Sequence, residues 1–173
     1  MTVILYCPKT RSLSGDTMLT SEGAYITSTQ TAKLRIIHHE EMKNKAIRNG
    51  GGNVIIGVSG YAHLFGNTID AITNETVNVL AKGEDKTLAL ILTPVALYRA
   101  FFEDGCAFYE EVGGYEPLAI GSGYSMTLAA YYACGDAYKA IDATSRVSLF
   151  VGGEFHQAYL ESQLVVVREF TKH

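Results

Sequence analysis

The residue best suited to chemistry is Thr2, which directly follows the initiator Met1 and opens an apolar, β-branched segment, TVILYC. Most chains begin with a disordered polar tail, whereas these residues have the composition of a core strand. If Met1 is removed, Thr2 becomes the N-terminus at the tip of that strand. The position of this hydroxyl is then either incidental or the active site.

Two charged residues, Asp16 and Lys33, are the other candidates. Asp16 follows a glycine, as in many turns, and Lys33 lies in the strand-like segment TAKLRIIHH, residues 31–39. Side chains alternate along a strand, so Leu34 and Ile36 share one face, and Lys33 and Arg35 share the other. This pattern is typical of a sheet with one solvated face, or of a sheet whose polar face lines a site. Spacing alone leaves both interpretations open.

Glycines and histidines give weaker signals. The segments GVSG (57–60) and AIGSG (119–123) lie where a strand gives way to a helix, which leaves backbone N–H groups able to face a ligand. On composition alone, ordinary strand-end geometry is the favoured explanation for them. His38 and His39 are adjacent, so on a strand they point to opposite faces and cannot chelate one metal together. No metal site is expected.

Hydrophobic periodicity predicts mostly strands with three helices. One helix is expected after residue 60, where Phe65, Ile69 and Ile72 recur at helical spacing. A second should end at Gly135, and Asp136 should cap a third that runs to about residue 148. Strands are expected over 2–7, near residue 13, and over 24–29, 31–39, 54–60, 87–94, 97–103, 106–112, 117–123 and 163–170. Runs of strands separated by runs of helices predict a layered α+β sandwich and argue against a doubly wound fold.

Composition fits one domain, residues 1–173, with 47% hydrophobic and 18% charged residues. The net charge of −4 gives no reason to expect nucleic acid or an anionic membrane as a partner. No apolar stretch approaches the roughly 20 residues that span a bilayer, and no signal peptide is expected. Three widely spaced cysteines without a CxxC motif favour a reduced, cytoplasmic setting.

A family resemblance joins these residues. The segments TVILYC, GDTML, AKLRII, IIGVSG and LAIGSGYSMTLAA occur in the order found in proteasome β-type subunits, and the sequence resembles the bacterial HslV peptidases most. The resemblance runs from Thr2 to about residue 160, and AIGSG followed by an alanine-rich helix is its most specific part. It implies the N-terminal nucleophile (Ntn) hydrolase fold, a four-layer αββα sandwich.

The resemblance also implies a mechanism for Thr2. In this family the nucleophile is the hydroxyl of an N-terminal threonine, and its own α-amino group acts as the base. An α-amine titrates near pH 7.7–8.0, and a nearby ammonium lowers its pKa further. Lys33 matches the lysine that exerts this effect, and Asp16 matches the carboxylate that keeps the lysine charged and oriented. Met1 must be removed for this chemistry.

Three more positions carry family roles. Gly60 matches the glycine whose N–H stabilises the oxyanion, a donor typically worth about 3–4 kcal/mol. Ser122 matches a serine near the threonine amine, and Val58 falls where the family lines the pocket for the substrate side chain. No cofactor or metal is expected, because nucleophile, base and oxyanion donor all come from the chain.

The resemblance implies a threonine endopeptidase that cuts polypeptide substrates inside a homo-oligomeric ring. The chain has no nucleotide-binding motif, so any AAA+ ATPase unfoldase would be a separate protein. Two other functions remain open. One is a non-catalytic, proteasome-like structural or assembly subunit that retains Met1, and the other is an Ntn amidase acting on a small amide.

Overall fold

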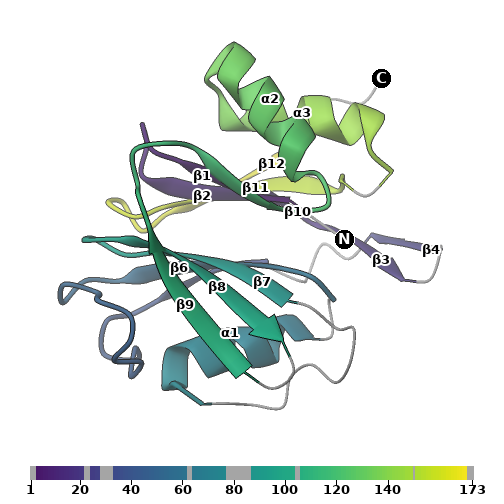
Figure 1. Ribbon diagram of the computed structural model, residues 1–173. Helices are drawn as coiled ribbons and strands as arrows, with labels where there is room; N and C mark the ends of the chain where they lie inside the picture. Colours follow the sequence, from purple (N-terminus) through teal and green to yellow (C-terminus); the bar gives the residue numbers. More distant parts are fainter. Residues whose placement is uncertain are drawn as a thin grey trace.

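Two five-stranded antiparallel sheets lie face to face in the computed structural model (Figure 1), which describes residues 3–21, 24–27, 33–61, 64–76, 87–103, 106–149 and 151–170. The first sheet has the strand order β10-β1-β2-β11-β12. Its strands are β10 (Leu118–Gly121), β1 (Val3–Cys7), β2 (Ser12–Asp16), β11 (Glu154–Tyr159) and β12 (Val165–Glu169). All residues of β1 and β2 are buried, so the start of the chain is a central core strand.

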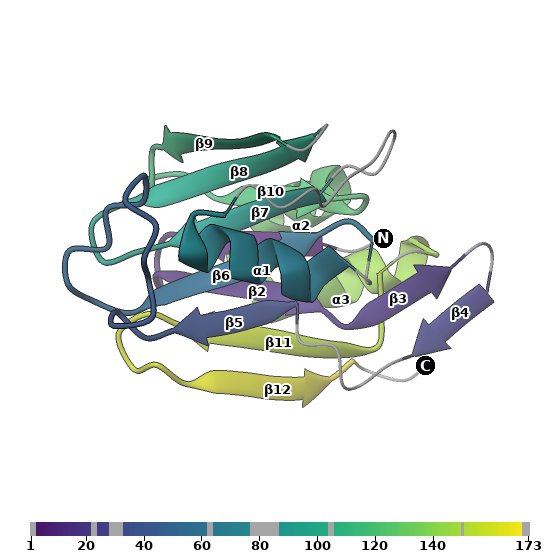
Figure 2. The same cartoon turned by 90° about the horizontal axis from the view of Figure 1, so that it is seen from below.

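The second sheet follows the chain in order, β5-β6-β7-β8-β9. Its strands are β5 (Leu34–Ile37), β6 (Val54–Ser59), β7 (Thr87–Leu92), β8 (Leu97–Glu103) and β9 (Cys106–Val112). The strands β6 and β7 are nearly continuous apolar runs because both of their faces are covered. A separate hairpin of β3 (Met18–Ser21) and β4 (Ala24–Thr27) projects from the side of the two sheets (Figure 2).

Three short helices cover the outer faces of the sheets. The helices α2 (Tyr124–Cys134) and α3 (Ala137–Val147) lie on the first sheet, and α1 (Phe65–Asn74) lies on the second (Figure 1). The predicted caps are confirmed: Gly135 ends α2 with a φ of 67°, and the Asp136 carboxylate accepts from the N–H of Lys139 at 2.9 Å. Among the described residues, no helix is long and apolar enough to cross a lipid bilayer.

The core forms three layers of packing. One cluster lies between the sheets and includes Ile4, Leu34 and Ala158. A second lies between the first sheet and the helices α2 and α3, and a third lies between the second sheet and α1. Gly57 allows the sheets to approach closely, because a Cβ there would lie 2.7 Å from Ile4 Cγ2 and 2.9 Å from a Leu34 methyl carbon. The strands that carry the candidate residues therefore cross at close contact.

The four-layer αββα sandwich of Ntn-hydrolase type is wrong as a description of this chain. The described residues form mostly antiparallel sheet, and the three helices have only 10, 11 and 11 residues. Within the described parts, α1 is the single helix on the second sheet, so no complete outer helical layer forms on that side. The helix expected after residue 60 is α1, which ends at Asn74, after which Glu75 takes a left-handed conformation.

Candidate functional site

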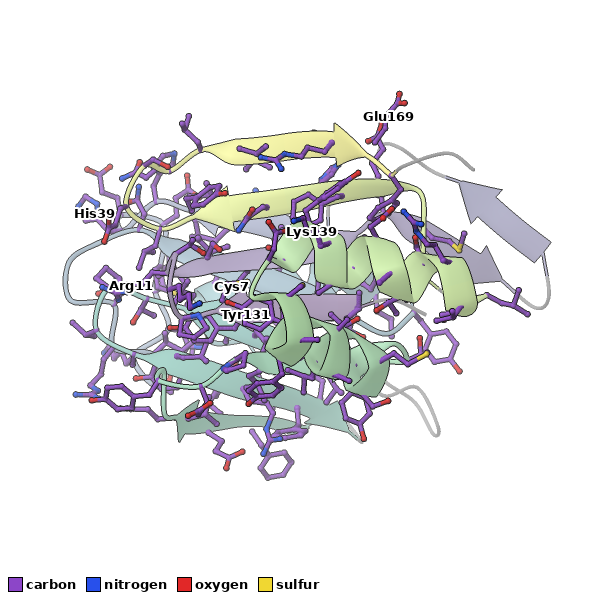
Figure 3. The ribbon with its side chains drawn as sticks, turned by 90° about the horizontal axis from the view of Figure 1, so that it is seen from above. Cys7, Arg11, His39, Tyr131, Lys139 and Glu169 are labelled. Atoms are coloured by element: carbon purple, nitrogen blue, oxygen red, sulfur yellow. The ribbon has the colours of Figure 1, made fainter. Side chains whose placement is uncertain are left out.

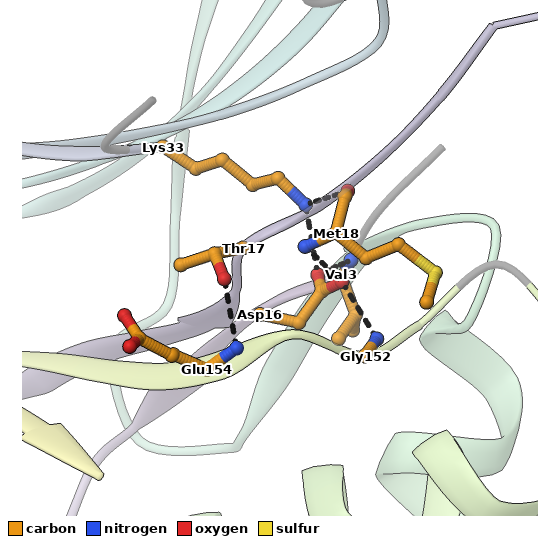
Figure 4. A network of polar contacts seen from close by, with 7 residues as sticks. All are labelled: Val3, Asp16, Thr17, Met18, Lys33, Gly152 and Glu154. Atoms are coloured by element: carbon orange, nitrogen blue, oxygen red, sulfur yellow. Dashed lines mark hydrogen bonds and ion pairs between the residues drawn. The ribbon is translucent and has the colours of Figure 1, made fainter. Parts of the chain in front are cut away.

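The carboxylate of Asp16, at the end of β2, is the centre of a buried polar cluster (Figure 4). Its Oδ1 accepts from the N–H of Val3 at 3.0 Å and from Lys33 Nζ at 3.1 Å. Its Oδ2 accepts from the N–H of Gly152 at 3.1 Å and from that of Met18 at 3.3 Å. Four donors from four separate parts of the chain therefore satisfy one ionised carboxylate, as a buried charge requires.

Lys33 is the opposite charge of this acid–lysine cluster, which consists of Val3, Asp16, Met18, Lys33 and Gly152. Its side chain is 1% exposed, and Nζ also donates to the Met18 carbonyl oxygen at 2.6 Å. Burial lowers the pKa of Lys33 from its ordinary value, and the charge and hydrogen bond of Asp16 oppose that change. A buried ammonium held in this way can lower the pKa of a neighbouring amine by like-charge repulsion. It has almost no contact with solvent to which it could donate a proton.

The loop before β11 supplies the part of the cluster that the family resemblance did not assign. Gly152 donates to Asp16, and Thr17 Oγ1 accepts from the N–H of Glu154 at 2.7 Å. Gly153 has a φ of 79°, and a Cβ there would lie 3.1 Å from the Met18 backbone nitrogen, so this position needs glycine. The adjacent glycines in VGGEF are the sequence signal that could have located this contact.

The remaining predicted residues are Val58, Gly60 and Ser122, and only the first has a hydrogen bond to a residue of the cluster in the described structure. The N–H of Val58 donates to the Lys33 carbonyl oxygen at 2.9 Å, which ties β6 to the lysine. The Val58 side chain, however, is fully buried in the cluster beneath α1. Gly60 follows the end of β6 with a φ of 137°, a conformation that favours glycine. Ser122 is exposed and follows Gly121, the residue that pairs with Val3.

Thr2 and Met1 lie outside the described residues. Thr2 is bonded to Val3, and the nitrogen of that peptide bond donates to Asp16. The structure thus brings Asp16, Lys33, Val3 and the backbone of Val58 together at the start of β1. Among the described residues, no group of three or more histidine, cysteine or acidic side chains could hold a metal ion.

Comparisons with known proteins find likeness only at the level of the fold. No protein-family model matches the chain, and no curated protein matches its sequence. Among solved structures, Anbu (ancestral beta-subunit) from Yersinia bercovieri is similar with a TM-score of 0.57 and 10% identity, covering 100% of this chain and 84% of that one. A Gly-1 mutant of Anbu from Hyphomicrobium sp. strain MC1 is similar with a TM-score of 0.60 and 13% identity, covering 99% and 88%.

These neighbours correct the family prediction. The resemblance to proteasome β-type subunits and to HslV peptidases is wrong as an assignment, because the two similar structures described above are Anbu proteins and no family model matches. The quoted segments fall mostly on the strands β1, β5, β6 and β10 and on the helix α2, so they report the order of these elements and do not identify a family. The chain has the fold of an ancestral beta-subunit.

Proposed function

We propose that the chain is a threonine peptidase subunit in which Thr2, exposed as the N-terminus after removal of Met1, is the nucleophile. The observation that carries this proposal is the buried acid–lysine cluster, which includes the backbone N–H of Val3, the residue that follows Thr2. A buried lysine–carboxylate pair costs desolvation energy and seldom adds stability over apolar residues of similar volume, so its presence favours a functional role. We infer that the lysine acts on Thr2, which is bonded to Val3 and carries both a hydroxyl and an amine.

The proposed reaction uses groups of the chain itself. The Thr2 hydroxyl oxygen attacks the substrate carbonyl carbon while its proton passes to the Thr2 α-amine. The Lys33 ammonium lowers the pKa of that amine by like-charge repulsion, so that the amine is a free base near neutral pH. Collapse of the tetrahedral intermediate breaks the peptide C–N bond, and the α-ammonium gives its proton to the leaving amine. Water, deprotonated by the α-amine, then hydrolyses the threonyl ester.

Three further roles belong to the same proposal. The backbone N–H of Gly60 is the donor to the oxyanion, and its positive φ fits a strand end that turns an N–H toward a ligand. We expect Ser122 to act beside the threonine amine, and the pairing of Gly121 with Val3 supports this role. Val58 acts through its backbone, which holds Lys33, because its side chain is buried beneath α1.

Homo-oligomerisation is part of the proposal, with a ring as the expected form. The residues Tyr124, Met126 and Tyr132 of α2 are 52%, 39% and 65% exposed, and large aromatic and methionine side chains are typical of interface cores. Substrates would then be polypeptides, and any ATPase unfoldase would be a separate protein. Light scattering that shows only an 18.8 kDa species at micromolar concentration contradicts this part.

The deciding experiment is the intact mass of the purified native protein together with cleavage of a fluorogenic peptide. We expect a chain that begins at Thr2 and an adduct of a threonine-directed covalent inhibitor on that residue. Thr2→Ala should abolish cleavage and leave assembly unchanged, whereas Thr2→Ser should retain part of the activity because hydroxyl and amine both survive. A mass that retains Met1 in every subunit, with no adduct, identifies a non-catalytic subunit instead.

A further inference from the structure

The first sheet is one strand wider than the second along one side. The edge strand β5 of the second sheet packs on β11, and β12 lies beyond it (Figure 2). Within the described parts of the chain, no strand pairs with the outer edge of β5 or of β12. The two edges together form a step, here called the β5–β12 slot, that is one strand wide.

The floor of the β5–β12 slot is apolar. Val165 pairs with Ala158, which belongs to the core between the sheets, so Val165 and Val167 face the same side as that core. They are nevertheless 46% and 52% exposed, because the second sheet ends at β5. Arg168 points to the opposite face, where its guanidinium lies 5.7 Å from the Tyr138 ring centroid on α3. Exposed valines on an uncharged stretch of edge strand favour pairing with another strand.

The wall of the slot offers backbone hydrogen bonds. Lys33 accepts from Val58 of β6, and hydrogen-bonded pairs alternate along an antiparallel ladder. Lys33, Arg35 and Ile37 therefore direct their backbone groups toward β6, and Leu34 and Ile36 direct theirs outward into the slot. A strand added beside β5 would complete the second sheet and cover the two valines.

One end of the slot is acidic. Glu154 and Glu169 are directly opposite each other on β11 and β12, on the same face as Val167. Like charges in this arrangement destabilise a sheet, and a cation placed between them relieves the repulsion. His156 Nε2 lies 3.4 Å from Glu154 Oε2, whereas Glu169 is exposed to solvent. Because Phe155 pairs with Asp16, which bonds Lys33, this acidic pair lies at the Lys33 end of β5.

We propose that the β5–β12 slot binds an extended polypeptide segment of a partner protein, which adds to the second sheet antiparallel to β5. Two alternate apolar side chains of the segment cover Val165 and Val167. A lysine or arginine two residues further toward its C-terminus lies between Glu154 and Glu169. A second copy of β12 in the same orientation would bring Glu169 to this acidic end, and that charge excludes it as the occupant.

Fluorescence anisotropy with a labelled peptide, Thr-Val-Thr-Val-Thr-Arg, tests the proposal on the Thr2→Ala variant, which keeps the probe intact whatever the enzymatic activity. We expect saturable binding that Val167→Asp weakens at least about tenfold. Glu154→Gln with Glu169→Gln should weaken binding of this peptide several-fold and leave a peptide ending in Thr unaffected. Val147→Asp is the matched control, since Val147 is 72% exposed on α3, and it should change nothing.

Three outcomes overturn the proposal. They are no saturable binding, binding that survives Val167→Asp, and a chain dimer that Val167→Asp dissociates while no peptide binds. The last outcome assigns the slot to a second copy of the chain. Because binding and not cleavage is measured, failure here leaves the proposed peptidase activity to be judged by its own experiment.

Discussion

Two polar clusters lie along β2, one with fully buried charges and one partly buried, and they are built differently. The acid–lysine cluster at Asp16 is charged and joins both sheets with the Gly152 loop. The hydroxyl–amide cluster at the other end consists of Cys7, Thr10, Ser12, Gln157 and Tyr159; it lies on the first sheet and its turn, and Cys7 also contacts Tyr131 of α2. There, Gln157 Nε2 donates to Ser12 Oγ at 2.8 Å, and the Tyr159 hydroxyl donates to Gln157 Oε1 at 2.8 Å.

The difference between the two clusters distinguishes a cluster that folding alone explains from one that needs a functional explanation. Neutral groups that satisfy one another cost little to bury and hold two strands in register. A buried ammonium and carboxylate cost much more, and apolar residues could replace them without loss of stability. The hydroxyl–amide cluster is therefore explained by folding alone, whereas the acid–lysine cluster calls for a chemical role.

The sharpest test of this contrast is Lys33→Ala. If the lysine tunes the Thr2 amine, peptidase activity should fall about 10³-fold or more, nearly as far as in Thr2→Ala, because losses within one catalytic unit do not add. Lys33→Arg should recover only part of it, since a planar guanidinium does not replace a compact ammonium. The measurement is kcat/KM on a fluorogenic peptide. Full activity in Lys33→Ala would remove the functional half of the comparison.

The second test is the stability of Asp16→Ala. Removing the carboxylate leaves the Lys33 charge buried and should lower the free energy of unfolding by about 3–5 kcal/mol in urea denaturation. Asp16→Ala combined with Lys33→Met should regain much of this loss. Glu110→Ala is the control, because Glu110 pairs with Arg99 at 2.6 Å on an exposed surface and should cost less than about 1 kcal/mol. Equal losses in both variants would contradict the buried-charge argument.

The third test uses pH at the hydroxyl–amide cluster. Burial raises the pKa of the Cys7 thiol from 9.0 to about 11. The folded state then holds this proton more tightly than the unfolded state, so the contribution is complete below pH 9.0 and is lost as pH rises toward 11. The loss amounts to about 2–3 kcal/mol. Cys7→Ala should flatten this pH dependence of unfolding, and Cys134→Ser, which changes an exposed thiol, should leave it unchanged.

The smallest effect is expected from Gln157→Leu. It leaves the hydroxyls of Ser12 and Tyr159 without their amide partner and should cost about 1–2 kcal/mol of unfolding free energy. Activity per folded molecule should stay unchanged, because the cluster lies away from Asp16 on β2. A loss of kcat/KM comparable to that of Lys33→Ala would show that the two clusters act together.

Sequence patterns predicted the strands well where apolar runs are continuous, as in β1, β6 and β7. They missed β11 because Gln157 is a buried polar residue and His156 interrupts the apolar alternation. Asp16 and Lys33 were candidates from the residues alone, but only the family resemblance gave them roles, since each is unremarkable by itself. The Gly152 contact depends on residues 136 positions apart, and no local pattern reports such a distance.

Two labelled side chains show the same limit. Cys7 of β1 and Tyr131 of α2 lie together between the first sheet and the helix (Figure 3), and burial raises the pKa of Tyr131 to about 12. Neither residue stands out in the sequence, because the contact joins a strand at the start of the chain to a helix near its end. The Val58 side chain is a related case, since strand alternation sends it beneath α1 although its backbone holds Lys33.

The origin of the four donors to Asp16 has a consequence for the timing of synthesis. They come from residues 3, 18, 33 and 152 of a chain of 173 residues. A ribosome must therefore reach residue 152 before the last donor exists, and the nascent protein must fold before the charges are enclosed. If the peptidase proposal holds, an unfinished polypeptide is inert, and the order of translation itself protects the cell from premature proteolysis.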